Sequence, residues 1–395
     1  MIRHLLKLVW HRRRANLLVV VEIFACFLVA FPLAGFGLFL WRNSTQPVGY
    51  DWRDVWSVVI DVGGDEAAGD GSEAAAATLA RLVAAARARP EVLSAAVAQL
   101  APLEMATSER DRDGVSTQAD LASDGFAEAM DLEIVAGRWF GPEDDAAAFR
   151  PVVVDRDLAR TLWGDADAIG RRFPIVLGEG DDERVVGVVA EFKKDGELAS
   201  PGNFVFYRAR LGEVAPPAIS RLVLEMAPGA DAAVEERLVG ELSALAPGWT
   251  LEVTPLARLR ANQIRTRLVP LVLGGTVALF LLAMVGLGLT GVLWQAITQR
   301  RGELGLRRAL GASRGQVRTQ VLGEVLLLAA VAVGAGTLVV VQLPLFELAG
   351  SLDPALFTGA LVVAVTTILG LALVCGLYPS RLAMRVEPAE ALRSE

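Results

Sequence analysis

The sequence predicts a membrane α-helical protein with four transmembrane helices and a large α+β extracytoplasmic domain between the first and the second of them. Four long runs are almost free of charge, and each exceeds the roughly 20 residues that a helix needs to cross a bilayer. The mean hydropathy of +0.43 over 395 residues is too high for a typical soluble protein. Acidic residues gather between the first two runs, whereas basic residues gather at the ends of the runs.

We expect the first span at about residues 15–41, after a basic cytosolic N-terminus of residues 1–14. This beginning resembles a secretory signal peptide, because a charged stretch precedes an apolar one. The apolar run is too long for a signal peptide, however, and no convincing small-residue cleavage site follows it. We therefore expect the segment to remain in the protein as a signal anchor.

Residues 42–267 are expected to form the extracytoplasmic domain, with two similar halves at about 50–114 and 201–255. In each half a β-rich run, a helical stretch and a second β-rich run follow one another, which is a β-α-β order. The halves flank an insertion at about 115–200. Two such halves suggest a split, ferredoxin-like layer of strands and helices.

The remainder of the chain alternates between apolar runs and short connections. Three further spans and the segments that join or follow them are expected at residues 268–296 (second span), 297–318 (cytosolic elbow), 319–343 (third span), 344–354 (short outer loop), 355–378 (fourth span) and 379–395 (cytosolic tail).

Charge predicts the orientation of the spans. Residues 42–262 hold 22 Lys and Arg against 38 Asp and Glu, a net charge of −16, and the remainder of the chain has a net charge of +8. Basic residues close to span ends favour the cytoplasmic side of a membrane. We therefore place both termini and the elbow in the cytosol and the acidic domain outside.

The elbow contains signals for a helix, a sharp turn and a second helix. Arg307 and Arg308 precede Gly311, and a basic last turn followed by glycine is a common way for a helix to end. Ser313 and Gln316 then have the spacing of a capping box, which begins a new helix. We expect this second helix to continue into the third span.

Two motifs carry a family resemblance. The elbow reads R-R-x-E-L-G-L-R-R-A-L-G-A-S, and the C-terminal segment reads Y-P-S-R-L-A-M-R-V-E-P-A-E-A-L-R. Together and in this order they resemble the MacB/FtsX-like permeases of ABC transporters, of the mechanotransmission type, and the sequence of the insertion is similar to the MacB-like extracytoplasmic domain of that family.

The resemblance implies that the elbow contacts a separate ATPase subunit on the cytosolic side. Matched to the family motif, the residues expected to couple the permease to the ATPase are Glu303, Gly305, Arg307, Arg308, Gly311, Ala312 and Ser313. The alternative for each arginine is a topology signal that also binds lipid head groups.

Residue types exclude several kinds of chemistry. The chain has no G-x-x-x-x-G-K-[ST] loop, and its two histidines, His4 and His11, precede the first span. We therefore expect no catalytic residue, no metal site and no cofactor in this chain, with ATP and magnesium bound by the ATPase partner. The acidic pairs Asp144-Asp145 and Asp181-Asp182 are interpreted as surface carboxylates. Nucleic-acid binding by the elbow is not expected, because two spans tether it and no aromatic residues interleave its arginines.

Two acidic residues and several small ones lie inside the predicted spans. Glu22 and Glu324 are intramembrane polar residues, which are costly in lipid unless they face other helices or water. Small residues allow helices to approach closely, either across a subunit interface or towards lipid. The glycines in question are Gly274, Gly275, Gly286, Gly288, Gly334 and Gly336. Cys26 and Cys375 also lie in spans, so the outer domain is expected to fold without a disulfide.

The resemblance implies a non-catalytic permease subunit that couples ATP hydrolysis in a partner to movements of its outer domain, driving export or extraction of a substrate from the envelope. Expected partners are two ATPase copies, a second permease copy or a paralogue, membrane lipids and, as an open question, a periplasmic adaptor. The expected location is the bacterial inner membrane. The alternatives are a signalling subunit that activates an envelope enzyme without transport, and an outer binding module that the spans merely anchor.

Overall fold

The computed structural model describes residues 13–63, 71–104, 109–112, 114–175, 182–299, 313–342 and 353–383. The chain divides into two compact units. One unit is the outer domain, Arg42–Arg267, and the other is a helical unit made of the described residues up to Trp41 and from Leu268 onwards. Residues 300–312 of the predicted elbow, the predicted loop at 343–352, the N-terminus up to residue 12 and the tail from residue 384 lie outside the described residues.

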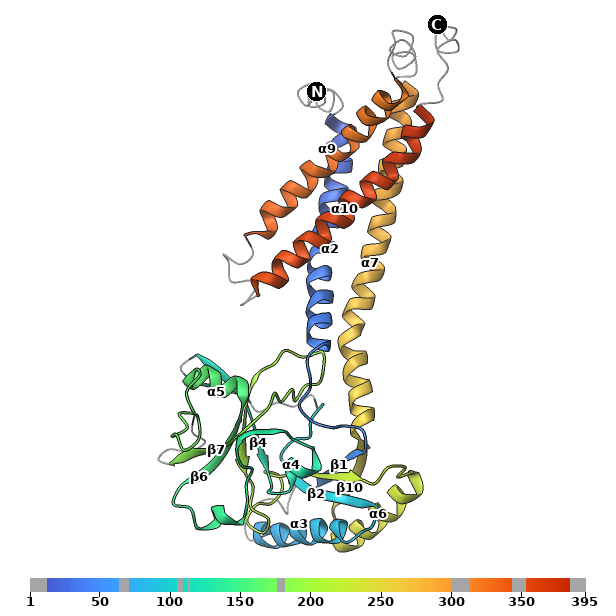
Figure 1. Cartoon of the computed structure of the whole chain (residues 1–395). Helices are drawn as coiled ribbons and strands as arrows, with labels where there is room; N and C mark the ends of the chain where they lie inside the picture. The colour runs from blue at the N-terminus through green and yellow to red at the C-terminus, as the bar shows by residue number, and fades with distance from the viewer. Residues whose placement is uncertain are drawn as a thin grey trace. The chain divides into compact units, whose positions relative to one another are not determined.

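Four long helices confirm the four predicted spans (Figure 1). They are α2 (Arg13–Ser44), α7 (Leu256–Gln299), α9 (Arg314–Val340) and α10 (Pro354–Ala383). Helix α7 has 44 residues, which at 1.5 Å per residue is about 66 Å, twice the hydrocarbon thickness of a bilayer. It begins twelve residues before the predicted span, because its first turns belong to the outer domain, where Leu256 and Leu259 pack in the core.

The four helices share an apolar core. Ile23 and Phe27 of α2, Leu289 of α7, Val325 of α9 and Ala364 of α10 are all at least 98 % buried. Several of the glycines in the spans lie where two of these helices approach each other. At Gly274, Gly286, Gly288 and Gly336, an added methyl group would meet side chains of other helices of the same chain, whereas nothing lies within 4 Å of it at Gly275 or Gly334.

The outer domain is built on one mixed sheet with helices against it. Its elements in chain order are β1 (Val55–Asp61), α3 (Gly71–Arg87), β2 (Val92–Ala98), β3 (Glu109–Arg112), β4 (Val115–Ala122), α4 (Phe126–Ala129), β5 (Ile134–Gly137), η1 (Pro142–Ala146), β6 (Arg150–Asp155), α5 (Arg156–Trp163), β7 (Glu183–Val189), β8 (Asn203–Arg208), β9 (Arg221–Met226), α6 (Ala232–Leu245) and β10 (Thr250–Pro255).

One half of the sheet has the order β10-β1-β9-β2, in which every neighbouring pair is antiparallel. Strands β1 and β2 flank α3, and strands β9 and β10 flank α6, so each group has the order β-α-β. The two units interleave, because β9 of the second unit lies between β1 and β2 of the first. This interleaving is the split, ferredoxin-like layer that the two similar halves suggested.

The same sheet continues beyond β2 in the order β4-β8-β6-β7-β5, with parallel pairing of β4 to β8 and of β6 to β7, while β3 pairs with β4 outside this path. Strands β4 to β7 belong to the insertion, whereas β8 lies in the segment predicted as part of the second half. The two halves of the sheet meet at β2 and β4, which share one registered pair, Ala98 and Ala122. We call this junction the seam.

Alternating residues along the strands face two different cores. On one face, α3 and α6 lie side by side over β10-β1-β9-β2, and α5 packs beside β6, β7 and β8 (Figure 1). On the opposite face, an aromatic core is shared by both halves and includes Phe126, Trp139, Phe204 and Phe206. The shared core makes the two halves one folded domain.

Candidate functional site

The ends of two membrane helices belong to the outer domain. The last residues of α2, from Arg42, and the first twelve residues of α7, up to Arg267, are part of this unit. One loop, Glu191–Ala199, follows β7 and contacts both helix ends. We call it the clamp loop, and its contacts make it the candidate functional site.

The clamp loop holds the C-terminal end of α2 through a buried lysine. Lys193 donates from Nζ to the backbone oxygen of Asn43 over 2.9 Å, and Asn43 donates from Nδ2 to the backbone oxygen of Leu198 over 3.3 Å. Lys193 is 2 % exposed and Asn43 is 4 % exposed. A cation at the C-terminus of a helix is favourable, because the last carbonyl groups have no partner within the helix. Burial lowers the pKa of Lys193, against the opposing effect of Glu191 and Glu197.

The segment after α2 packs beneath the same loop. The Lys193 amide donates to the backbone oxygen of Val48, and the Tyr50 hydroxyl donates to the backbone oxygen of Lys193. Gly49 has a φ of +85°, and a Cβ atom there would lie 1.5 Å from the backbone oxygen of Glu191. Only glycine fits this position, since the backbone needs a positive φ and no space exists for a side chain.

The beginning of α7 is held by a second set of contacts with the clamp loop. Arg260 forms a bidentate ion pair with Glu197, with Nη2 2.9 Å and 2.8 Å from the two carboxylate oxygens. The Arg260 guanidinium also lies 4.2 Å from the ring centroid of Trp52, a cation–π contact. Further along α7, Nη2 of Arg267 lies 4.0 Å from Oδ2 of Asp195 in the clamp loop. Leu256, at the first position of α7, is fully buried in the aromatic core.

Aromatic rings connect the clamp loop to the centre of the domain. The ring of Phe192, in the clamp loop, lies 5.3 Å from that of Tyr50 and 4.6 Å and 4.9 Å from those of Phe204 and Phe206 on β8. Phe192 therefore links the clamp loop to β8 through direct ring contacts.

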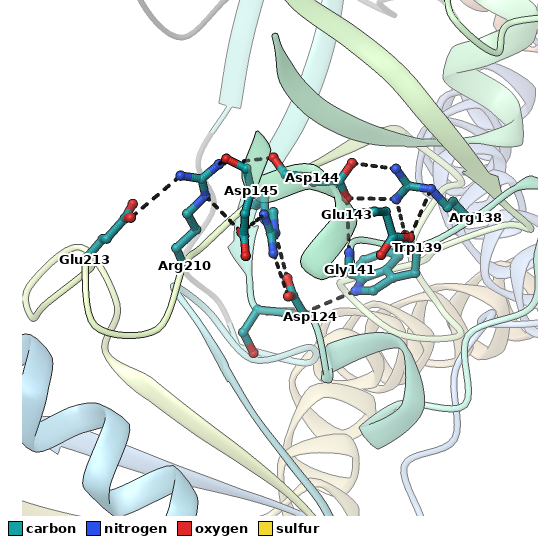
Figure 2. A network of polar contacts seen from close by, with 11 residues as sticks. Asp124, Arg138, Trp139, Gly141, Glu143, Asp144, Asp145, Arg210 and Glu213 are labelled. Carbon is teal, nitrogen blue, oxygen red and sulfur yellow. Dashed lines mark hydrogen bonds and ion pairs between the residues drawn. The ribbon is translucent and has the colours of Figure 1, made fainter. Parts of the chain in front are cut away.

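The acidic pair Asp144-Asp145 is engaged in ion pairs (Figure 2). Asp144 accepts two hydrogen bonds from Arg138, at 2.7 Å and 2.5 Å. Burial alone would raise the pKa of Asp144, but the hydrogen bonds from Arg138 and the Gly141 amide outweigh it and lower that pKa. Asp145 pairs with Arg208 at 2.7 Å. Asp144 thus holds the segment before β6 to the residue that follows β5, and Asp145 holds the same segment to the end of β8.

The interpretation of these acids as surface carboxylates is wrong for Asp144, which is 1 % exposed. The segment from Arg138 to Asp144 folds back on itself, so that the Arg138 guanidinium neutralises this carboxylate. The two adjacent acids in the sequence do not by themselves indicate that partner. In the second pair, Asp182 lies at the surface and pairs with Arg184 at 2.8 Å, whereas Asp181 lies outside the described residues.

The predicted coupling residues fall almost entirely outside the described part of the chain. Glu303, Gly305, Arg307, Arg308, Gly311 and Ala312 lie there, so their role stays a prediction. Ser313 is described, and the predicted capping box at the start of α9 is confirmed. The Gln316 amide donates to Ser313 Oγ over 3.3 Å, and the Ser313 amide donates to Gln316 Oε1 over 2.9 Å.

Both predicted intramembrane acids lie on helices of the bundle. The carboxylate of Glu22 in α2 lies against α7 at Gly288, where a Cβ atom would be 2.6 Å from Glu22 Oε2. Glu324 in α9 accepts a hydrogen bond of 3.5 Å from Gln320, one turn earlier on the same helix. Glu22 therefore faces another helix, whereas this hydrogen bond of Glu324 stays within its own.

Sequence reasoning missed the clamp loop. One signal was available, because Lys193 and Lys194 are two of only three lysines in the chain and stand side by side directly after a buried strand. Both are buried, at 2 % and 3 % exposure. Two adjacent lysines after a strand are usually interpreted as exposed to solvent. The neighbouring sequence does not indicate that their hydrogen-bond partners are 90 and 150 residues away.

Comparison with known proteins gives two family matches. The MacB-like periplasmic core domain matches residues 34–240, and the C-terminal domain of FtsX-like permeases matches residues 275–388. Together the two matches cover most of the chain. The residues between them, 241–274, comprise the end of α6, β10 and the first part of α7.

Individual relatives are similar over about two thirds of this chain. The macrolide export ATP-binding/permease protein MacB 1/2 of Paracoccus denitrificans is 27 % identical over 70 % of this chain and 42 % of its own length. The pyoverdine export ATP-binding/permease protein PvdT of Pseudomonas aeruginosa is 26 % identical over 68 % of this chain and 41 % of its own. An uncharacterized ABC transporter permease of Bacillus subtilis, YknZ, is 23 % identical over 69 % of each chain. This chain thus spans less than half the length of the first two relatives.

Proposed function

Since the chain belongs to the family of FtsX-like permeases that carry a MacB-like periplasmic core domain, we propose that it couples ATP hydrolysis in a separate ATPase subunit to movements of its outer domain. Those movements drive export or extraction of a substrate from the cell envelope. Two permease copies, identical or related, work with two copies of the ATPase.

The clamp loop is the observation that supports this proposal most directly. A domain that is merely anchored needs one connection to the membrane, and that connection can be flexible. Here both connections are helical up to the point where they enter the domain, and both ends are fixed by buried or bidentate contacts to one loop. A helical connection of this kind transmits a displacement of either helix to the domain, whereas a flexible linker would absorb it.

The proposed sequence of events begins in the cytosol. Closure of the ATPase pair displaces the elbow, where Glu303, Arg307 and Arg308 are the proposed contacts. Helices α2 and α7 carry the displacement outwards as stalks, and the clamp loop receives it. The outer domains of the two copies then shift against each other, so mechanical work is done outside the membrane with energy released inside.

The first experiment tests the clamp. Glu197→Gln and Arg260→Gln each remove one partner of an ion pair whose side chains are 26 % and 30 % exposed, so we expect about 1 kcal/mol of destabilisation and a folded protein. In the complex with the ATPase, ATP hydrolysis should continue while the ATP-dependent change in distance between two outer domains falls. That distance is measured between spin labels at Arg160→Cys on α5, in a background without Cys26 and Cys375.

The charge exchange Glu197→Arg with Arg260→Glu should restore part of the distance change. Arg258→Gln is the matched control, because Arg258 is an exposed arginine two residues earlier on α7. An unchanged distance response in both single variants would show that the clamp does not transmit movement.

The second experiment tests the elbow by pull-down of the ATPase encoded nearest to this chain. Wild type is compared with Glu303→Ala and with Arg307→Glu/Arg308→Glu, after membrane insertion of each variant is verified. Weaker binding or uncoupled hydrolysis in the variants supports the coupling role. Failure of any ATPase to bind would favour a signalling or anchoring role instead.

A further inference from the structure

Leu103 has a backbone conformation that its side chain disfavours. Its φ is 69°, in the left-handed region that bulky residues rarely adopt. The residue is 4 % exposed, so it is not part of an open surface turn. A strained conformation of this kind persists only where the surrounding contacts enforce it.

The contacts that enforce this conformation come from α7 and from the clamp loop. Gln263 of α7 donates from Nε2 to the Leu103 backbone oxygen over 3.1 Å, and the Leu103 amide donates to the backbone oxygen of Lys194 over 2.7 Å. The Leu103 side chain packs on Gly196, where a Cβ atom would be 2.7 Å from Leu103 Cδ2. Leu103 is thus held by α7 on one side and by the clamp loop on the other.

The segment that contains Leu103 also spans the seam of the sheet. We call residues 99–104 the seam loop. Its Glu104 forms an ion pair of 2.6 Å with Arg221 on β9 and accepts a hydrogen bond from Lys194 Nζ at its backbone oxygen. Its Leu100 amide donates over 3.2 Å to the carboxylate of Asp120 on β4. The loop therefore contacts both halves of the sheet where they share one registered pair.

We propose that Gln263 and Leu103 form a strained latch, through which the position of α7 determines whether the seam loop is held in its strained conformation or released. This deepens the proposed function and rests on it, because it assumes that α7 moves. When α7 shifts so that Gln263 leaves the Leu103 carbonyl, the loop relaxes and the seam loses a contact to each half of the sheet.

The strain can be tested with two substitutions at one position. Leu103→Ala and Leu103→Gly both remove the buried side chain, but glycine adopts positive φ without penalty and alanine does not. In a relaxed segment the alanine variant would be the more stable, since glycine gains more freedom on unfolding. We expect the opposite order, with a higher melting temperature for Leu103→Gly. Equal melting temperatures, or a higher one for Leu103→Ala, would overturn the proposal.

The latch itself is tested by adding Gln263→Leu to the wild type and to each of these two variants. The full chain is reconstituted in lipid nanodiscs, and hydrogen exchange is measured by mass spectrometry in peptides that cover residues 99–104. In the wild type, Gln263→Leu should accelerate exchange there by a factor of about 5 to 30, the range that the strain of one such residue can supply. Asn262→Leu, at the exposed neighbouring position on α7, should leave the exchange unchanged.

The variant background separates a latch from an ordinary hydrogen bond. If strain drives the release, Gln263→Leu should accelerate exchange much less in the Leu103→Gly background than in the Leu103→Ala background. The same acceleration in both backgrounds, or none in the wild type, would contradict the latch. No ATPase is present in these measurements, so they succeed or fail independently of the experiments that test the transport role.

Discussion

At the scale of single residues, Gly49 is the glycine with the least space for a side chain among those that the structure describes. Gly49→Ala would combine a disfavoured φ with a clash against the backbone of Glu191, so we expect destabilisation of more than about 3 kcal/mol. Thermal unfolding of the purified full chain measures it. Gly212→Ala is the matched control, because Gly212 has a φ of +92° but nothing within 4 Å of the added methyl group, and only about 1 kcal/mol of backbone strain is expected. Similar losses for both variants would show that the clash at Gly49 is relieved.

Asp155 is a second residue with a testable property. Its Oδ1 accepts hydrogen bonds from the Leu158 amide at 2.9 Å, as the N-cap of α5, and from the Phe204 amide at 3.0 Å. Burial nevertheless raises the pKa of Asp155 to about 8. Between its unfolded pKa of 3.8 and this value, the folded chain binds more protons than the unfolded one, so the free energy of unfolding falls as pH rises across that window.

Asp155→Asn should remove this part of the pH dependence, because an amide oxygen still accepts both hydrogen bonds but does not titrate. Melting temperatures at pH 5, 7 and 8.5 are the measurement, with Asp165→Asn, an exposed position in the next loop, as the control. Burial also raises the pKa of Asp120 to about 8, so the slope should be reduced and not abolished. Parallel curves for wild type and Asp155→Asn would contradict the assignment.

At the scale of elements, the contact between α2 and α9 depends on Gly336. A methyl group there would come within 2.3 Å of the Phe27 ring, so Gly336→Ala forces the two helices apart, and we expect a loss of about 1–3 kcal/mol. Gly334→Ala lies two residues earlier on α9 with nothing within 4 Å, and should be neutral or slightly stabilising because alanine favours helix. Thermal unfolding in detergent distinguishes the two, and equal melting temperatures would mean that α9 does not pack on α2 in this way.

Elements defined by local patterns were predictable from the sequence. Apolar runs marked α2, α7, α9 and α10, and alternating or β-branched runs marked β1, β2, β9 and β10. The capping box at Ser313 was found for the same reason, since its two residues are three positions apart. What the sequence did not reveal is non-local: β4 pairs in parallel with β8, so that Thr117 is in register with Asn203, and no periodicity within either strand indicates that partner.

At the scale of the whole molecule, the candidate site was the part least accessible to sequence reasoning. The resemblance directed attention to the elbow, where Glu303, Arg307 and Arg308 remain predictions. The clamp loop lies in the outer domain, and its essential contacts join Lys193 to Asn43 across 150 residues and Arg260 to Glu197 across 63. Of these residues only Lys193 stands out in its own neighbourhood, as one of a pair of lysines in a chain that has three, and the pair does not indicate its partner. Only folding brings the three segments together.

The clamp loop also constrains how this protein can diverge. Because one loop of nine residues fits the end of α2, the turn at Gly49 and the first turns of α7 at once, a change in any of these segments is tolerated only with compensation in another. Among homologues we therefore expect correlated substitution between positions 197 and 260, with paired reversal of charge. In an alignment of homologous sequences, the connection between the membrane helices and the outer domain would then appear as covariation between segments far apart in the chain.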